Sequence, residues 1–306
     1  MFDIITLGSA TVDMFVKSKN ENIKHEKNGV EHRDIAYHLG EKMLVEDLEI
    51  NTGGGGTNSA VAFSRLGLKT GFIGALGRDV NGEFVGAELK KEGVEFLGHT
   101  EKGKTGLSVI LPGKGDRTIL TYKGVNDSLS YNAEHLPQTN WLYVSTMIGK
   151  SFNSVEKIVA EAKRRNVKIA FNPSLYLAKQ GFAKLKKILA CVDIVILNKE
   201  EAYALTGKTH QKEMLESIAF HVNGIIVITD GASKIYALSG KEFYSLMPHD
   251  VKFIDSTGAG DAFASGFVFG IMRGESIQKA LHFGLKESES VLGEIGAKNN
   301  LLHHLA

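Results

Sequence analysis

The residues best suited to chemistry lie in the run DSTGAGD at 255–261. Apolar residues at helical spacing follow, so we predict a helix that begins near Ala259. The first amides of a helix are unpaired donors at the positive end of its dipole, and a phosphate is a natural ligand there. Asp261 would then lie beside the anion, where its carboxylate can take the proton of an attacking hydroxyl. Alone, such a motif more often marks an ordinary glycine-rich turn, so the rest of the chain must decide.

A second glycine-rich run, NTGGGGTN at 51–58, opens directly into residues with helical spacing. Four glycines in a row can form a flexible linker, but this run is short and ends in two helix-capping residue types. We therefore predict a backbone that approaches a ligand closely. Asp13 lies just beyond the predicted first strand, 2–8, where open α/β sheets bind ligands. Asp13 can equally cap a turn, and Asn58 can equally cap a helix.

Length and composition fit one large α/β domain of 306 residues. The net charge of +1 implies no general attraction to nucleic acid or to a membrane surface. A single cysteine rules out an internal disulfide, and no apolar run approaches the length of a membrane span. The first residues lack the basic region of a signal peptide, so we expect a cytoplasmic protein.

From residue 141 onward, strands alternate with helices. Polar residues follow the predicted strands 167–171, 192–197 and 225–229. This alternation predicts a parallel sheet flanked by helices, with the polar strand ends along its ligand-binding edge. The G-x-G-x-x-G fingerprint of dinucleotide-binding domains does not follow the first strand.

Two further segments need a separate interpretation. Residues 17–50 are rich in charged side chains and indicate a loop or a small polar sheet outside the main core. Residues 98–105 fit the phosphate-loop pattern G-x-x-x-x-G-K-[ST], but that mechanism requires a helix directly afterwards. A β-hairpin pattern over 105–122 follows instead, so we reject the match.

The two glycine motifs together resemble the signatures of the ribokinase-like (PfkB) carbohydrate kinase family. GGxGxN at 53–58 and GxDxxG at 77–82 resemble its N-terminal signature, and 255–266 resembles its C-terminal one. The resemblance covers essentially the whole chain. It implies a single 1–306 domain with a three-layer α/β/α fold and a mostly parallel central sheet. Residues 12–50 and 105–123 would form a small β-sheet lid within that domain.

The resemblance implies transfer of the γ-phosphoryl group of ATP to a sugar hydroxyl. Asp261 would be the general base, and the amides of Gly258, Ala259 and Gly260 would form the anion hole. The acceptor site would comprise Asp13, Gly54, Gly55 and Asn58. The nucleotide site would comprise Asn198, Glu201, Thr229 and Gly231. Asn198 and Glu201 would also hold Mg²⁺ through water, and a monovalent cation such as K⁺ is a further candidate cofactor.

Departures from the family pattern bear on the substrate. Gly55 replaces a lysine that is frequent in ribokinases and phosphosugar kinases, and Thr146 and Met147 offer no carboxylate where many ribokinases have a glutamate. We therefore expect an unphosphorylated, furanose-bearing sugar as acceptor. Lys234 replaces a glycine of the nucleotide turn, and Leu285 stands where relatives often place an asparagine near the adenine.

Two alternatives stay open. The first is a nucleoside kinase of the same family, because the long segment 17–50 could form a roomier lid. The second is a catalytically silent sugar- or nucleotide-binding relative, since a fold alone does not fix function. Such lids pair between subunits in similar kinases, so we also expect a homodimer.

Overall fold

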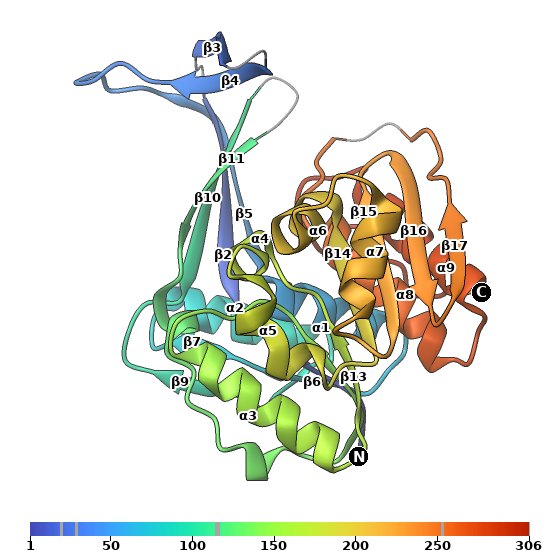
Figure 1. Cartoon of the computed structure of the whole chain (residues 1–306). Coiled ribbons are helices and arrows are strands. Elements are labelled where there is room, and N and C mark those ends of the chain that lie inside the picture. The colour runs from blue at the N-terminus through green and yellow to red at the C-terminus, as the bar shows by residue number, and fades with distance from the viewer. Residues whose placement is uncertain (19–20, 28–29, 114–116, 252–253, 306) are drawn as a thin grey trace.

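The computed structural model describes residues 1–18, 21–27, 30–113, 117–251 and 254–305 (Figure 1). Its centre is a sheet of nine strands in the order β17-β16-β15-β14-β13-β12-β1-β6-β8. The strands from β15 to β8 pair in parallel, and β16 and β17 continue the sheet as an antiparallel edge. The predicted sheet is therefore confirmed.

The strands of this sheet are, in chain order, β1 (Phe2–Leu7), β6 (Thr70–Ile73), β8 (Glu95–Phe96), β12 (Thr139–Val144), β13 (Lys168–Phe171), β14 (Ile194–Asn198), β15 (Ile225–Asp230), β16 (Ser233–Ser239) and β17 (Glu242–Leu246). The α-helices are α1 (Gly55–Arg65), α2 (Val80–Lys91), α3 (Ser151–Arg164), α4 (Leu175–Ala178), α5 (Gly181–Leu189), α6 (Lys199–Thr206), α7 (Gln211–Ala219), α8 (Ala259–Met272) and α9 (Ile277–Val291). Two short 3₁₀ turns span Gly124–Asp127 and Ala133–His135.

Alternation along the central strands builds a core on each face of the sheet. In β12, Leu142 and Val144 pack with the side chains of α3, α5 and α7, whereas Tyr143 packs with those of α1, α8 and α9. Because successive side chains of a strand point to opposite faces, one strand contributes to both cores. The result is the three-layer α/β/α arrangement that the sequence predicts.

A second, smaller sheet rises from the body on the side away from β16 and β17 (Figure 1). Its order is β11-β10-β2-β5, with bounds β2 (Thr11–Ser18), β5 (Val45–Gly53), β10 (Gly106–Pro112) and β11 (Arg117–Tyr122). The two-stranded hairpin β3 (Glu21–Lys27) and β4 (Val30–Ala36) continues from its far end, and β7 (Ala75–Gly77) pairs with β9 (His99–Glu101) in a separate two-stranded sheet. Of the two interpretations open for 17–50, the sheet is the right one.

The rejected phosphate loop is not followed by a helix. After β9 the chain passes through Gly103 and Lys104 directly into β10, which pairs antiparallel with β11. Helix α2 begins at Val80, inside the GxDxxG motif of 77–82, because Asp79 caps it by accepting a hydrogen bond from the amide of Gly82. The second half of this motif is therefore the first turn of α2.

Candidate active site

Asp261 lies in the first turn of α8, directly against the N-terminal half of α1. Its Oδ2 accepts a hydrogen bond of 2.8 Å from Nδ2 of Asn58. The Oδ1 of Asn58 is buried and has no hydrogen-bond partner among the described residues. The structure therefore brings together the predicted base and one predicted acceptor residue, and it leaves an amide oxygen that can accept a hydroxyl hydrogen bond.

The segment 255–260, which comprises the loop before α8 and the first two residues of that helix, is called the anion loop below. Gly258 adopts φ +79° at the N-cap position, and a side chain there would come within 2.3 Å of Ala297 Cβ. The first intrahelical hydrogen bond runs from the amide of Ala262 to the carbonyl of Gly258, so the preceding amides stand outside the helical ladder. One of them is partly engaged, because the amide of Ala259 donates to the carbonyl of Ser256 at 3.3 Å.

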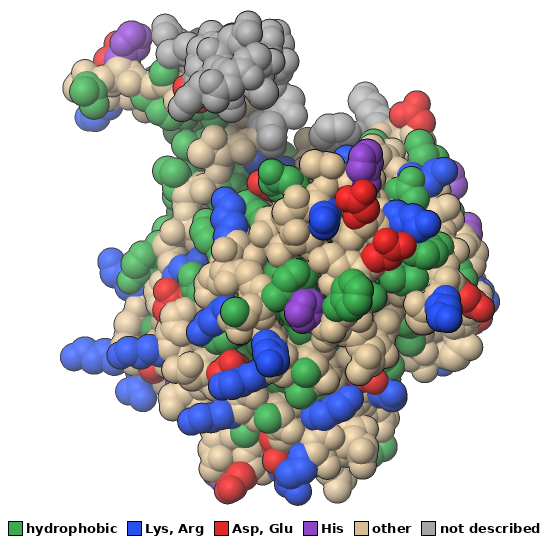
Figure 2. All heavy atoms as spheres, in the orientation of Figure 1, with side chains coloured by type: hydrophobic (Ala, Val, Ile, Leu, Met, Phe, Trp, Pro, Cys, Tyr) green, Lys and Arg blue, Asp and Glu red, His purple; other side chains and the backbone are tan. Residues whose placement is uncertain are grey.

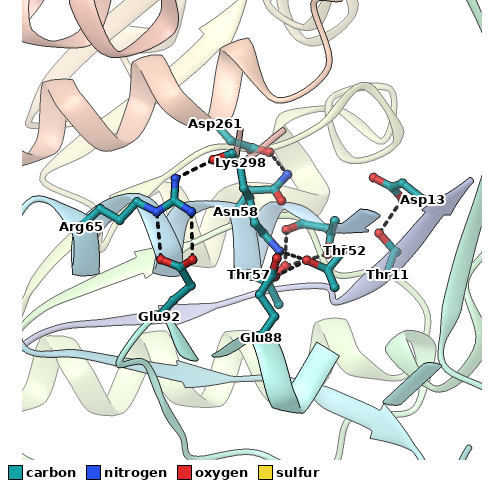
Figure 3. A network of polar contacts seen from close by, with 12 residues as sticks. Thr11, Asp13, Thr52, Thr57, Asn58, Arg65, Glu88, Glu92, Asp261 and Lys298 are labelled. Carbon is teal, nitrogen blue, oxygen red and sulfur yellow. Dashed lines mark hydrogen bonds and ion pairs between the residues drawn. The ribbon is translucent and has the colours of Figure 1, made fainter. Parts of the chain in front are cut away.

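Asp13 points from β2 toward the glycines at the end of β5. It is 8% exposed, and its Oδ1 accepts a hydrogen bond of 2.9 Å from Thr11 (Figure 3). A Cβ on Gly53 would lie 1.9 Å from Asp13 Oδ2, so this position has no room for a side chain. Gly54 follows with φ +95° and packs against the carbonyl of Ser9. This backbone therefore packs closely against Asp13 and against the residues just before β2, whereas its predicted approach to a ligand stays a prediction.

Gly55, the first residue of α1, lies between Ser145 and Asp261. A Cβ there would be 2.2 Å from Ser145 Oγ and 3.3 Å from Asp261 Oδ1. The two oxygens thus flank one point over Gly55. No larger residue, a lysine included, fits at this position unless Ser145 moves.

Burial sets the electrostatics of the two aspartates. It raises the pKa of Asp13, while hydrogen bonds from Thr11 and Ser108 and the charge of Lys298 oppose the rise. Burial likewise raises the pKa of Asp261, and the hydrogen bond from Asn58 and the charge of Lys298 again act in the opposite direction. The positive charge of Lys298 therefore favours the ionised form of both carboxylates. This is the form that a general base, or a group that accepts a hydroxyl hydrogen bond, requires.

Asn198 and Glu201 form the N-terminal cap of α6. Asn198 Oδ1 accepts from the amide of Glu201 at 2.8 Å, and Glu201 Oε2 accepts from the amide of Asn198 at 2.8 Å. This reciprocal capping box is a structural role for both residues, independent of any ligand. Partial burial of Glu201 raises the pKa of its carboxyl group to about 7, and the negative charge of Asp261 adds to the rise. The carboxylates of Glu201 and Asp261 therefore interact electrostatically, although they belong to different helices.

A cavity of about 1170 Å³ extends from the small sheet to the anion loop and on to the end of β15. Its lining includes Asp255, Ser256 and Ala259 of the anion loop, Gly231 after β15, and Leu285 of α9. Gly231 adopts φ +55°, and Thr229 precedes it in β15. The volume exceeds the roughly 300–1,000 Å³ of ordinary small-molecule sites, so the cavity has room for more than one ligand. Asn198 and Glu201 are not among the described residues that line it.

One face of the small sheet forms a wall of this cavity. The lining side chains alternate along the strands and include Phe15 and Lys17 in β2, Glu49 in β5 and Ile110 in β10. Asp13 shares this inner face, because it stands two residues from Phe15. Arg117 at the start of β11 donates a hydrogen bond to the hydroxyl of Ser256, so the small sheet contacts the anion loop directly.

Several residues of the site escape sequence reasoning. Ser145 directly follows β12 and reaches the site only because Gly55 packs against it. Lys298 lies in the C-terminal segment, where no sequence pattern indicates burial. For Arg117 a signal exists: alternation within the predicted hairpin places it on the same face as Ile110, through the pairs Ile110 with Ile119 and Pro112 with Arg117.

Residues 18–304 match the family described as pfkB family carbohydrate kinase. The chain belongs to this family. The carbohydrate kinase is 27% identical over 275 residues to a ribokinase from Haemophilus influenzae, covering 86% of this chain and 88% of that one. It is 29% identical over 306 residues to a 5-dehydro-2-deoxygluconokinase from Clostridium tetani, covering 92% of this chain and 84% of the relative.

Solved structures agree on the fold. The adenosine kinase from Sinorhizobium meliloti superposes with a TM-score of 0.80 at 21% identity, covering 97% of this chain and 95% of that one. The predicted ribokinase-like architecture is thereby confirmed. As a carbohydrate kinase of this family, the protein phosphorylates a sugar hydroxyl at the expense of ATP. Within the described residues, none of the helices has the length and apolarity needed to cross a membrane.

Proposed function

We propose that Asp261 is the general base of this kinase. The acceptor hydroxyl gives its proton to the Asp261 carboxylate, its oxygen attacks the γ-phosphorus of ATP, and the bond to the β-phosphate oxygen breaks to release ADP. The supporting observation is the position of Asp261 in the first turn of α8, where Asn58 orients it at 2.8 Å beside the anion loop. Amides of Gly258, Ala259 and Gly260 stabilise the charge on the transferred group.

Asn198 and Glu201 are proposed to hold Mg²⁺ through water, and Thr229 and Gly231 to contact the nucleotide. The residues present fit such a cation: one Glu201 oxygen is engaged by the capping box, and the other is not hydrogen-bonded to a described residue. A hard cation bound mainly by water and phosphates requires only one or two protein oxygens, and the described residues contain no cluster of three or more acidic or histidine ligands. Bound Mg²⁺ would neutralise phosphate charge. Activation by a monovalent cation such as K⁺ is a separate proposal. A comparison of turnover in K⁺ buffer with turnover in Na⁺ buffer tests it.

For the acceptor we propose an unphosphorylated, furanose-bearing sugar. Asp13 and Asn58 supply groups that accept hydroxyl hydrogen bonds, and Gly55 supplies no cation for a substrate phosphate. A nucleoside is the second candidate. It is favoured by the size of the cavity, whose 1170 Å³ extends under the inner face of the small sheet, the face that also carries Asp13.

An acceptor panel at saturating ATP tests the proposal. Ribose, fructose, 2-keto-3-deoxygluconate, adenosine, cytidine and fructose 6-phosphate would be compared by kcat/KM. We expect the highest value with an unphosphorylated sugar. A clear preference for fructose 6-phosphate would refute the inference from Gly55, and a preference for a nucleoside over every free sugar would select the second candidate. A protein that binds these ligands without turning over ATP would be the silent relative.

The small sheet is proposed to act as a lid within one 1–306 domain, and to join two subunits. Its inner face lines the cavity, whereas its outer face is apolar: Leu48, Ile50, Leu120 and Tyr122 are each about half exposed. Apolar side chains are visible along the sheet where it rises from the body (Figure 2). We propose that a second copy of the chain covers this outer face and that the dimer works in the cytoplasm.

A further inference from the structure

Lys298 is a lysine of the C-terminal segment whose side chain is almost completely buried. Only 5% of the side chain is exposed, and its Nζ lies 2.6 Å from Glu88 Oε2 and 2.6 Å from Thr52 Oγ1 (Figure 3). Thr52 Oγ1 also donates to the Glu88 carboxylate. Burying an ammonium group is costly unless it is paired and hydrogen-bonded, and here two elements supply the partners: β5 through Thr52 and α2 through Glu88.

Thr52 connects this lysine to the acceptor side of the site. It begins the stretch 52–58, called the β5–α1 corner below, which contains the glycines packed against Asp13 and the amide of Asn58. The hydroxyl of Thr57 closes the corner by donating to the carbonyl of Gly53 at 2.6 Å. A group that fixes Thr52 therefore fixes the start of a corner whose backbone lies against the acceptor-binding aspartate.

The two residues before Lys298 connect the same segment to the phosphate side. The amide of Gly296 donates to Asp255 Oδ2 at 3.3 Å, and Ala297 packs so closely that Gly258 cannot carry a side chain. Arg65 of α1, itself paired with Glu92, donates from Nη1 to the carbonyl of Lys298 at 2.8 Å. The tripeptide 296–298 thus contacts the anion loop with its first two residues and the β5–α1 corner with its third.

We propose that Lys298 is a positioning residue for the acceptor, holding the β5–α1 corner and the anion loop in one arrangement through the segment 296–298. This inference rests on the proposed roles of Asp13 and Asp261. The charge of Lys298 has a second effect, because it lowers the pKa of both aspartates against the rise caused by burial. Lys298 touches neither the acceptor nor the phosphates in this scheme and acts only through Thr52, the two aspartates and the anion loop.

The test must separate this role from simple neutralisation of Glu88. Lys298→Met removes the charge but leaves Glu88 unpaired, whereas Lys298→Met combined with Glu88→Gln removes both charges. The exposed Lys91 on the same helix as Glu88 provides a matched control, Lys91→Met. KM for the acceptor and KM for ATP would be measured with whichever of ribose, fructose, 2-keto-3-deoxygluconate, adenosine or cytidine gives the wild-type protein its highest kcat/KM.

We expect the double variant to raise the acceptor KM at least about fivefold, as for the loss of one charge-assisted hydrogen bond, with the KM for ATP within about twofold of wild type. Lys91→Met should change neither. A double variant with the wild-type acceptor KM would show that Lys298 serves only to pair Glu88. A parallel rise in both KM values would show a general loosening and would equally overturn the proposal.

Two further measurements keep the result decisive. Thr52→Val keeps both charges and removes only the hydroxyl that Lys298 contacts, so it should also raise the acceptor KM. It provides the test if the double variant fails to fold. In the absence of ligands, amide hydrogen exchange of the double variant should be faster than that of the wild type in both 52–58 and 255–260. Faster exchange confined to α2 would contradict the proposed link between the β5–α1 corner and the anion loop. Asp13→Asn is the reference: if it leaves the acceptor KM unchanged, the proposed acceptor site is wrong, whereas an effect of Asp13→Asn without one of Lys298 refutes the present inference alone.

Discussion

Asn58 and Asp261 lie 203 residues apart in the sequence, yet Nδ2 of Asn58 donates a hydrogen bond of 2.8 Å to Oδ2 of Asp261. The contact joins the first turns of α1 and α8, the two helices that follow the two glycine motifs. It orients one carboxylate oxygen and leaves the other, Oδ1, beside Gly55. A base held in this way faces a ligand that binds between the β5–α1 corner and the anion loop.

Replacement of Asp261 by asparagine should lower kcat by roughly two to four orders of magnitude, because a positioned general base is removed while its shape is kept. ATP affinity should change little. Steady-state kinetics with the best acceptor would measure the effect, and Glu200→Gln, at an exposed position of α6, would be the control. Retention of most of the wild-type turnover by Asp261→Asn would remove Asp261 from the role of base.

Gly55→Ala tests the close packing over the corner. The added Cβ would meet Ser145 Oγ at 2.2 Å, so either the serine or the start of α1 must shift, and Asp261 lies only 3.3 Å from the same point. We expect kcat/KM to fall at least about tenfold, the scale of effect expected when reacting groups are displaced. Adding Ser145→Ala should recover part of the loss by removing the nearest oxygen. An unimpaired Gly55→Ala enzyme would show that the corner is more adaptable than its packing indicates.

The parts of the site that the sequence predicts depend on short-range patterns. A glycine-rich run that opens a helix identifies the anion loop and the β5–α1 corner, because the amides at a helix start are available whatever the rest of the chain does. Polar residues at strand ends likewise identify Asn198 and Thr229, since parallel strands place those ends along one edge of the sheet. Local chemistry and sheet direction suffice for these residues.

Other features depend on contacts between distant segments. Lys298 looks like a surface lysine until the fold brings its side chain to Thr52 of β5 and Glu88 of α2, and Ser145 gains its place only from the absence of a side chain at Gly55. The charged residues of 17–50 indicate a loop or a small polar sheet, but the register places Lys17, Asp47 and Glu49 on the face that carries Asp13 and leaves an apolar outer face. A one-residue shift in register would reverse the two faces, which composition alone does not reveal.

Lys104→Ala should leave the dissociation constant of ATP nearly unchanged. The side chain is exposed in the loop between β9 and β10, and the neighbouring Thr105 is committed to Asp79, which accepts from its hydroxyl at 2.6 Å. No helix N-terminus follows to meet a phosphate. Calorimetric titration with ATP would provide the measurement. A large weakening of ATP binding in a folded variant would restore the phosphate-loop interpretation of 98–105.

Glu287 predicts a pH dependence of stability. It is completely buried in α9, and burial raises its pKa from 4.5 to about 8. The folded protein therefore keeps this carboxyl protonated up to about pH 8, whereas the unfolded chain releases the proton near its ordinary pKa. Stability supplied by the neutral form is full below the unfolded pKa and is lost as the pH rises toward 8.

Glu287→Gln removes this titration and keeps the shape of the neutral side chain. Its free energy of unfolding should be close to that of the wild type at pH 5 and should exceed it by a few kcal/mol at pH 8.5, since one unit of pKa shift corresponds to about 1.4 kcal/mol. Urea unfolding at both values would measure the gap. For the exposed Glu294→Gln the gap should not widen with pH. A constant gap for Glu287→Gln as well would show that the carboxyl is ionised in the folded protein.

The outer face of the small sheet leads to the last prediction. Ile50 and Leu120 lie on this face, because the register pairs Ile50 with Met14 of β2 and Leu120 with Val109 of β10, and Met14 is in turn paired with Val109. Each is about half exposed in the single chain. A two-fold interface uses the same surface on both subunits, so one substitution there is introduced twice.

Ile50→Glu and Leu120→Glu should therefore convert a dimer to monomers in sedimentation velocity at micromolar concentration, since each places a pair of like charges in an apolar contact. Phe220→Glu is the matched control, because Phe220 is 88% exposed but lies after α7, outside the small sheet. Dissociation by Phe220→Glu would place the interface elsewhere. A wild-type protein that sediments as a monomer would remove the proposed dimer and leave the chemistry of Asp261 untouched, because Asp261, Asn58 and Gly55 all come from one chain.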